Sequence, residues 1–240
     1  MKYQAKDVEI NYINYGNKKG QNIVLLHGWG QNIEMMKPIG DNLQSKYNIY
    51  IVDLPGHGSS TEPTSAWQLS DFATCLKEMF DHLKIKKPIL VGHSVGGEIA
   101  LVYASMFECE KIVLMDSPFR PIKKLSLKTK VLKSLKKVPG LNKLENFAKK
   151  HMGSTEYRSA SIIMRQILVN SVNTDLTETV KNIKASCIII WGTIDDTVPL
   201  ESGYDLEKLM KDAALIEYEN CTHYAYLEDL GRTVGIIDSF

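Results

Sequence analysis

The sequence predicts an α/β fold, a mostly parallel sheet of about eight strands with helices on both faces and one helical insertion. The 240 residues suit one domain with a modest insertion. Short apolar runs rich in β-branched residues recur along the chain, and several end at Gly, Asp or Pro, as strands buried on both faces do. Segments of helical periodicity separate several of these runs, which is typical of right-handed crossovers between parallel strands.

A hairpin and six inner strands account for the predicted sheet. The alternating pattern over residues 3–15 predicts a hairpin that gives the sheet an antiparallel edge. Residues 69–83 predict a helix, because their apolar side chains are spaced by threes and fours. The six inner strands are expected at 23–26, 49–52, 89–91, 112–115, 187–191 and 214–218.

Residues 118–183 interrupt this alternation, because their pattern is helical and contains no convincing strand. Pro139-Gly140 marks the end of one helix and the turn to the next. An insertion at this point would lie over the carboxyl ends of the strands, where ligands bind in open α/β sheets. We therefore predict an α/β core of 1–117 and 184–240, covered by a helical cap, or lid, of 118–183.

The charge is unevenly distributed. The chain has 29 Lys and Arg against 28 Asp and Glu, and a net charge of +1 gives no overall sign of a nucleic-acid partner. Residues 119–165, however, hold 13 basic and 2 acidic residues (+11), which leaves 16 basic and 26 acidic residues (−10) elsewhere. Residues 123–137 read as a basic amphipathic helix that could contact an anionic membrane weakly or attract an anionic substrate. The alternative is a lid whose apolar side covers the pocket and whose lysines are solvated.

Cysteine usage and the N-terminus favour a cytoplasmic protein. The four cysteines show no CxxC spacing, and a chain of this length needs no disulfide, so we expect reduced thiols. No apolar run approaches signal-peptide length or the roughly 20 residues that span a bilayer. No metal or cofactor is expected, since the paired acids Asp195-Asp196 and Glu228-Asp229 lack spaced His or Cys partners and no phosphate-binding motif follows a strand.

The segment Gly92-His93-Ser94-Val95-Gly96 lies between a predicted strand and a predicted helix, the context of a nucleophile elbow. In so tight a turn side chains at Gly92 and Gly96 would collide. The turn would hold Ser94 at a helix N-terminus, where backbone N–H groups favour a developing negative charge. Ser94 is therefore the predicted nucleophile, and the alternative is a small-residue turn that packs helix on strand.

An oxyanion hole is predicted from two backbone N–H groups. Val95 follows the nucleophile, and Trp29 lies in the HGWG segment 27–30, directly after the strand at 23–26. Such donors stabilise the negative charge that develops on a carbonyl oxygen under attack.

The acid and the basic histidine are expected directly after later strands, with the acid first along the chain. His223 follows the last predicted strand and is the expected general base. We expect His27, His57 and His93 to bind backbone or brace loops, and His82 and His151 to face solvent. Three carboxylates follow predicted strands and are candidates for the acid: Asp195, Asp196 and Asp116. Spacing alone does not decide between Asp195 and Asp196.

Five motifs in order resemble the α/β-hydrolase fold in its single-domain, lidded form: HGWG at 27–30, DLPGHGSS at 53–60, GHSVGG at 92–97, GTIDDTVP at 192–199 and CTHYAYLED at 221–229. The family pattern G-x-x-D-x-x-V-P implies Asp195 as the acid, and H-x-x-x-L-E implies His223 as the base. Some relatives carry the acid after the earlier strand, which keeps Asp116 in reserve. The serine at the elbow separates the chain from the dehalogenases and epoxide hydrolases of this fold, which use Asp.

The resemblance also bears on the substrate. Relatives often have a Trp some residues after the HG motif, where this chain has Met35-Met36, so we expect Trp29, Met35 and Met36 to line a substrate pocket. The HGWG and GHS-x-GG pair is similar to carboxylesterases of the biotin-synthesis type, which cleave short acyl esters. Together these features predict a serine hydrolase that cleaves an ester or thioester of a small or medium acyl substrate through an acyl-enzyme on Ser94. The alternatives are a C–C bond hydrolase, or a receptor or sensor with this fold and little turnover.

Overall fold

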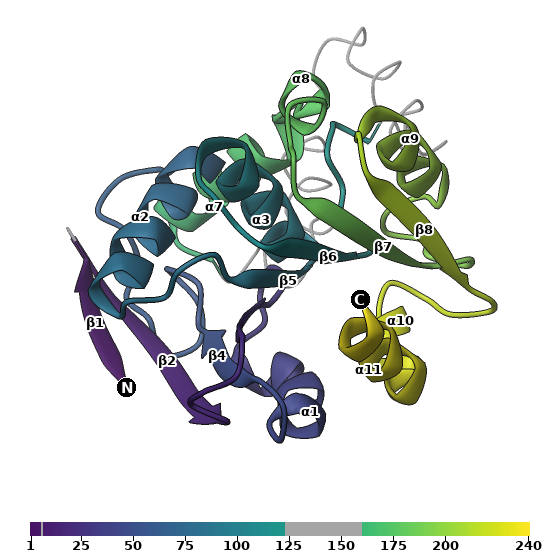
Figure 1. Cartoon of the computed structure of the whole chain (residues 1–240). Coiled ribbons are helices and arrows are strands. Elements are labelled where there is room, and N and C mark those ends of the chain that lie inside the picture. Colours follow the sequence, from purple (N-terminus) through teal and green to yellow (C-terminus); the bar gives the residue numbers. More distant parts are fainter. Residues whose placement is uncertain (6, 123–159) are drawn as a thin grey trace, which may run out of the picture.

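An eight-stranded sheet organises the chain. The computed structural model describes residues 1–5, 7–122 and 160–240 (Figure 1). The strand order is β1-β2-β4-β3-β5-β6-β7-β8, and from β4 to β8 all neighbours are parallel. The strands are β1 (Lys2–Ala5), β2 (Val8–Gly16), β3 (Asn22–Leu26), β4 (Asn48–Val52), β5 (Ile89–His93), β6 (Lys111–Met115), β7 (Ser186–Gly192) and β8 (Ala213–Tyr218).

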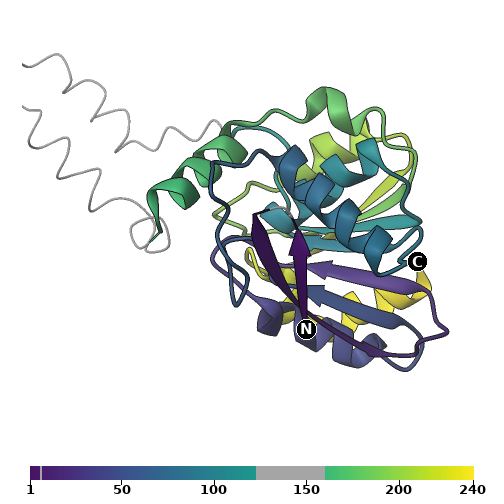
Figure 2. The same cartoon turned by 90° about the vertical axis from the view of Figure 1, so that its left-hand side faces the viewer.

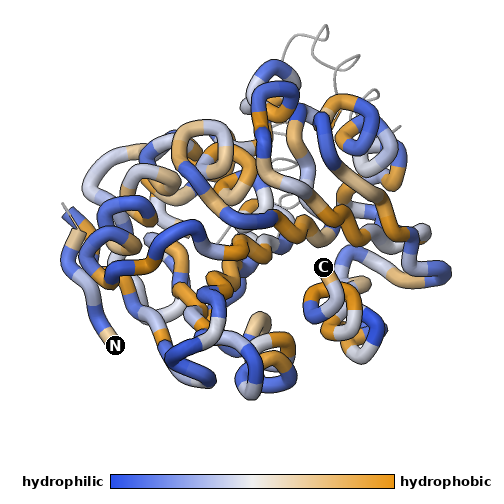
Figure 3. Tube along the Cα trace, viewed as in Figure 1, coloured by the Kyte–Doolittle hydropathy of each residue, from blue (hydrophilic) through white to orange (hydrophobic). Residues whose placement is uncertain are grey.

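The predicted strands are confirmed. The N-terminal residues form the antiparallel pair β1–β2, and β2 joins the sheet antiparallel to β4. Each of the six predicted inner runs is a strand, and the residues of β4 and β5 are buried throughout. Apolar side chains on both faces make such a strand stable only between two helical layers, and orange hydrophobic segments accordingly follow the inner strands in Figure 3.

The two helical layers each enclose a core cluster (Figures 1 and 2). On one face α1, α10 and α11 pack over residues such as Ile23, Leu25 and Val91, and on the other α2, α3, α8 and α9 pack over residues such as Val24 and Leu90. The helices are α1 (Ile33–Leu43), α2 (Leu69–His82), α3 (Val95–Met106), α7 (Ile162–Asn173), α8 (Thr177–Val180), α9 (Glu201–Leu209), α10 (Ala225–Glu228) and α11 (Leu230–Ser239).

The described part of the predicted cap, residues 118–122 and 160–183, contains the helices α7 and α8 and no strand. Met164 and Ile167 of α7 belong to the core cluster beneath it, and the Leu176 N–H donates to the Phe119 carbonyl at 2.7 Å. The predicted lysine-rich face at 123–137 and His151 lie outside the described residues. Within the described ranges no helix is both long enough and apolar enough to cross a membrane.

Candidate active site

Ser94 lies in the sharp turn between β5 and α3. Its φ of +50° and ψ of −120° are strained for a residue with a Cβ atom. The turn is held because the Ser94 N–H donates to the Met115 carbonyl of the adjacent strand at 3.0 Å, and the Gly97 N–H donates to the Ser94 carbonyl at 2.9 Å. A Cβ at Gly92 would lie 2.5 Å from the Gly96 carbonyl oxygen, so the tight turn requires glycine there. Ser94 is thus presented at the start of α3, partly exposed.

The loop after β3 lies against the start of α3. A Cβ at Gly96 would lie 2.4 Å from the Leu26 carbonyl oxygen, so the two backbones are in direct contact. Gln31 braces this loop, because its Oε1 accepts the Gly28 N–H at 2.9 Å. Within the described part of the chain, neither the Trp29 N–H nor the Val95 N–H donates to another protein group. Both N–H groups therefore lack a described protein acceptor near the turn at Ser94.

His223 and Asp195 form a buried hydrogen-bonded pair. The His223 Nδ1 and Asp195 Oδ2 atoms are 2.8 Å apart, and each residue is only 8% exposed. The other Asp195 oxygen accepts the N–H groups of Thr197 at 2.8 Å and Val198 at 2.9 Å. A carboxylate can only accept, so Nδ1 carries a proton and donates it to Asp195.

His93 links this pair to the turn at Ser94. Its Nε2 lies 2.8 Å from the His223 carbonyl oxygen and must donate, because a carbonyl only accepts. Burial lowers the pKa of His93 to about 3, so the ring is neutral and serves as a fixed bridge. The residue next to Ser94 therefore anchors the backbone of His223. Among the described residues no hydrogen bond joins Ser94 Oγ to the His223 ring.

The remaining histidines behave as predicted where they are described. The ring of His27 donates to the Gly28 carbonyl at 2.7 Å and accepts the Leu54 N–H at 3.0 Å, and burial lowers its pKa to about 4. His57 Nδ1 lies 3.1 Å from the Pro55 carbonyl oxygen, and His82 is exposed. His27 and His57 are thus internal braces of the loops around the site.

The three candidate acids have different surroundings. Asp195 contacts His223, whereas Asp196 is exposed. Asp116 is fully buried at the end of β6, and its Oδ1 accepts the Gly192 N–H at 2.9 Å. One ligand-type atom from each of Asp116, Asp195 and His223 lies within 4.8 Å of the others, which is the kind of cluster that can hold a metal ion. Within this cluster Asp195 is hydrogen-bonded to His223 and to the N–H groups of Thr197 and Val198.

A cavity of about 200 Å³ opens beside Trp29. The Trp29 ring meets the His57 ring edge-on with centroids 4.8 Å apart, and Met164 of α7 also lines the cavity. Sequence reasoning missed Met164 and Gln31, since neither lies within a motif. The lining residues are Trp29, Gly30, Gly56, His57, Glu62, Ala160 and Met164.

Met36 lies in a core cluster and does not line the cavity beside Trp29. Met36 is 0% exposed and packs in the core cluster with Ile33 and Ile39, on the face of α1 that lies against the sheet. Helical spacing places residues three apart on one side, so the phase of α1 directs Met36 inward. Met35 is half-buried and does not line the cavity at Trp29.

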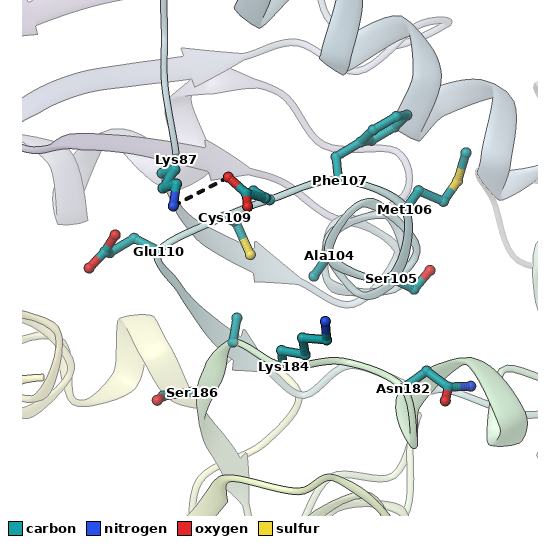
Figure 4. Close-up of a pocket in the computed structure, with 12 residues that line it drawn as sticks. Lys87, Ala104, Ser105, Met106, Phe107, Cys109, Glu110, Asn182, Lys184 and Ser186 are labelled. Carbon is teal, nitrogen blue, oxygen red and sulfur yellow. Dashed lines mark ion pairs between the residues drawn. The ribbon is translucent and has the colours of Figure 1, made fainter.

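A second cavity, of about 430 Å³, lies at the opposite edge of the sheet (Figure 4). Its lining residues come from the end of α3 and from the segments that lead into β5, β6 and β7, whereas Ser94, Asp195 and His223 follow strands. The Lys87 ammonium and Glu108 carboxylate at its rim are 3.3 Å apart. This cavity is therefore separate from the candidate active site.

Comparison with known proteins decides the family. A family model described as the alpha/beta hydrolase fold matches residues 21–150. The chain belongs to the α/β hydrolase family. It is 26% identical over 248 residues to a pimeloyl-[acyl-carrier protein] methyl ester esterase of Aliivibrio fischeri, covering 92% of this chain and 94% of the relative. It is 25% identical over 253 residues to a 2-hydroxy-6-oxononadienedioate/2-hydroxy-6-oxononatrienedioate hydrolase of Pseudomonas putida, covering 92% and 88%.

Solved structures share the fold of this α/β hydrolase. A membrane phospholipase A described as a bacterial virulence factor aligns with a TM-score of 0.81 at 22% identity, over 100% of this chain and 84% of that one. A meta-cleavage product hydrolase of Pseudomonas fluorescens IP01, solved as a serine-to-alanine mutant complexed with acetates, aligns with a TM-score of 0.74 at 23% identity, over 96% and 93%. At these identities the likeness extends to the fold alone.

Proposed function

We propose that this α/β hydrolase is a serine hydrolase that cleaves a carboxylic ester or thioester of a small or medium acyl substrate. The observation that carries the proposal is the 2.8 Å hydrogen bond between His223 and Asp195, anchored through His93 beside the strained turn of Ser94. Three groups from the ends of three strands then have the roles of nucleophile, base and orienting acid.

In the first half-reaction the Ser94 Oγ attacks the carbonyl carbon of the substrate while His223 Nε2 takes the hydroxyl proton. Asp195 stabilises the imidazolium through Nδ1–H. The backbone N–H groups of Trp29 and Val95 would hold the oxyanion. Collapse of the tetrahedral intermediate breaks the bond to the alcohol or thiol, which receives the proton from His223 and leaves Ser94 acylated.

Water completes the cycle. His223 takes a proton from the water as it attacks the acyl-enzyme, and the second tetrahedral intermediate releases the carboxylic acid and returns the proton to Ser94 Oγ. The ring thus acts as base and then as acid twice per turnover.

The cavity of about 200 Å³ is lined by Trp29, whose N–H is one of the two proposed oxyanion donors, so part of the substrate would lie there. An esterase among the relatives, named for a methyl ester, is consistent with a short acyl or alkoxy group. Residues 118–183 would form the lid over this site, and the protein would act in the cytoplasm on a small-molecule substrate.

The test is a substrate series combined with active-site labelling. Acyl esters of p-nitrophenol and acyl-CoA thioesters of increasing chain length should reveal a preference for short chains, and a fluorophosphonate should label Ser94. Ser94→Ala should abolish both. Ser105→Ala is a matched control from the same helix, since its Oγ bonds to the Val102 carbonyl within that helix. Absence of both turnover and labelling in the wild-type protein would refute the proposal.

The relative from Pseudomonas putida favours a second candidate, hydrolysis of a carbon–carbon bond. The same serine and histidine would serve this chemistry, so the sequence does not separate the two. A substrate panel that includes β-diketones alongside the esters distinguishes the two activities, because a carbon–carbon hydrolase should turn over the diketone at least as fast as the ester.

A further inference from the structure

Asp116 is a buried carboxyl group with one unused oxygen. It follows β6 with a φ of +48°, a strained conformation for a residue with a side chain, and it is 0% exposed. Its N–H donates to the Ile190 carbonyl at 3.0 Å, and its Oδ1 accepts the Gly192 N–H at 2.9 Å. Among the described residues Oδ2 has no hydrogen-bond partner, although it is buried. A buried polar atom of this kind needs an explanation.

The neighbouring carboxylate has room for one more donor. A carboxylate has about four acceptor positions, and Asp195 uses one for His223, one for Thr197 and one for Val198. An oxygen of Asp116 lies within 4.8 Å of an oxygen of Asp195. A hydrogen bond between the two side chains is one of the causes that raise the pKa of Asp116, so a hydroxyl on Asp116 could supply the fourth hydrogen bond to Asp195.

The charges around Asp116 favour its neutral form. The titratable groups that face it are Asp195, His223, Cys221, Tyr226 and Glu228. Of these only His223 can carry a positive charge, and Asp195 is already hydrogen-bonded to it. Burial is the largest of the causes that together raise the pKa of Asp116 to about 8; the Gly192 N–H acts in the opposite direction, and the adjacent Asp195 adds to the rise.

We propose that Asp116 is a positioning residue that stays protonated at neutral pH and donates its Oδ2–H to the Asp195 carboxylate, so that one negative charge rather than two faces His223. Two buried carboxyl groups in contact share a proton for the same reason. The hydrogen bond holds Asp195 in line with Nδ1 of His223 and completes its acceptor positions. The inference rests on the proposed triad of Ser94, His223 and Asp195.

The proposal predicts a loss of activity at alkaline pH. Above about pH 8 Asp116 loses the shared proton, and repulsion between the two carboxylates displaces Asp195 from His223. Because Asp116 does not touch the substrate, the effect should appear in kcat and leave KM nearly unchanged.

Three variants test it with p-nitrophenyl acetate as the probe. Asp116→Asn keeps a neutral side chain with an N–H donor, so kcat at pH 7 should stay within about threefold and the alkaline decrease should disappear. Asp116→Ala removes the donor to a charged group, and kcat should fall about tenfold or more. Glu98→Gln is the matched control, because Glu98 is also a buried carboxyl group whose pKa is raised to about 8, and it contacts Ser171 instead of Asp195. The Glu98→Gln variant should still lose kcat above about pH 8, as the wild-type protein does.

Infrared spectroscopy at pH 7 provides a readout that needs no activity. A protonated carboxyl group has a C=O stretch distinct from carboxylate bands. That band should survive in Glu98→Gln and be lost from the Glu98→Gln, Asp116→Asn double variant. Disappearance of the band in Glu98→Gln alone shows that Asp116 is ionised and overturns the inference, even if the Asp116 variants do not fold. An alkaline decrease that persists in a folded Asp116→Asn protein overturns it as well. If Ser94→Ala keeps full activity the proposed function fails, while the infrared result still reports on Asp116.

Discussion

The substitution Glu98→Gln should remove a pH-dependent cost of folding. Glu98 lies in the first turn of α3, is 3% exposed and accepts the Ser171 hydroxyl of α7 at 2.7 Å. Burial raises its pKa from 4.5 to about 8, and the hydrogen bond from Ser171 lowers it by a smaller amount. The residue therefore ties the nucleophile helix to a helix of the predicted cap in its protonated form.

The sign and size follow from proton linkage. Above pH 4.5 the unfolded chain releases the Glu98 proton, whereas the folded chain retains it until about pH 8. The free energy of unfolding thus falls as the pH rises through this interval, by about 1.4 kcal/mol for each pH unit. Glutamine is neutral throughout and can still accept the Ser171 hydroxyl. Relative to wild type, the variant should gain about 3 to 5 kcal/mol between pH 4.5 and pH 8.

Urea unfolding at several pH values measures this difference. The curves of wild type and Glu98→Gln should nearly coincide at pH 5 and diverge steadily toward pH 8.5. Glu178→Gln is the control, since that side chain is exposed on the neighbouring α8 and pairs with Lys181. Parallel pH profiles for wild type and Glu98→Gln would refute the reasoning, because they would show that the buried group titrates alike in both states.

Three further outcomes are expected. Asp195→Asn should lower kcat about 10⁴-fold, because the amide favours the wrong tautomer of His223, while Asp196→Asn, at an exposed position, should change kcat less than twofold in the same ester assay. Gly96→Ala would place a carbon 2.4 Å from the Leu26 carbonyl and should sharply lower both the melting temperature and turnover, whereas Gly235→Ala in α11, with nothing within 4 Å, should be neutral or stabilising by up to about 1 kcal/mol. The excess positive charge of 119–165 predicts at most weak sedimentation with anionic vesicles, abolished by salt, and equal binding to neutral vesicles would exclude an electrostatic contact.

The sheet was predictable because its signal is local. Runs of β-branched residues bounded by turn formers have few stable alternatives to a buried strand, and all six inner runs are strands. The ends are less predictable, because pairing decides them. The prediction ended one strand at residue 91, but β5 continues to His93 since Gly92 and His93 pair with Leu114 and Met115 of β6.

Side-chain direction was harder to predict than element type. Met35 and Met36 were both assigned to the pocket, yet only the phase of α1 decides which one faces the sheet, and that phase depends on where the helix begins. The cavity residue Met164 comes from a helix more than 130 positions after Trp29. Contacts between such distant segments have no local signature in a single sequence.

The charge state of a buried carboxyl group depends on how many hydrogen-bond donors surround it. The identity of the residue does not reveal that number. Asp53 accepts three N–H groups, from Ile33, Ser59 and the Asn11 side chain, and three donors can compensate a buried negative charge. Asp195 likewise has two backbone donors and His223. Among the described residues Glu98 and Asp116 each have one donor, and for both of them burial is the main cause of a pKa raised to about 8.

Most of these donors are backbone N–H groups positioned by turns, and every residue type except proline supplies one. The sequence spacing therefore predicted that Asp116, Asp195 and Asp196 lie at the same edge of the sheet, but it did not predict which of them contacts His223. The turn after β7 distinguishes them, because it directs two N–H groups at Asp195, leaves Asp196 in solvent, and offers Asp116 only the Gly192 N–H. The same turn thus makes one carboxylate a partner for His223 and leaves the other to be neutralised by a proton.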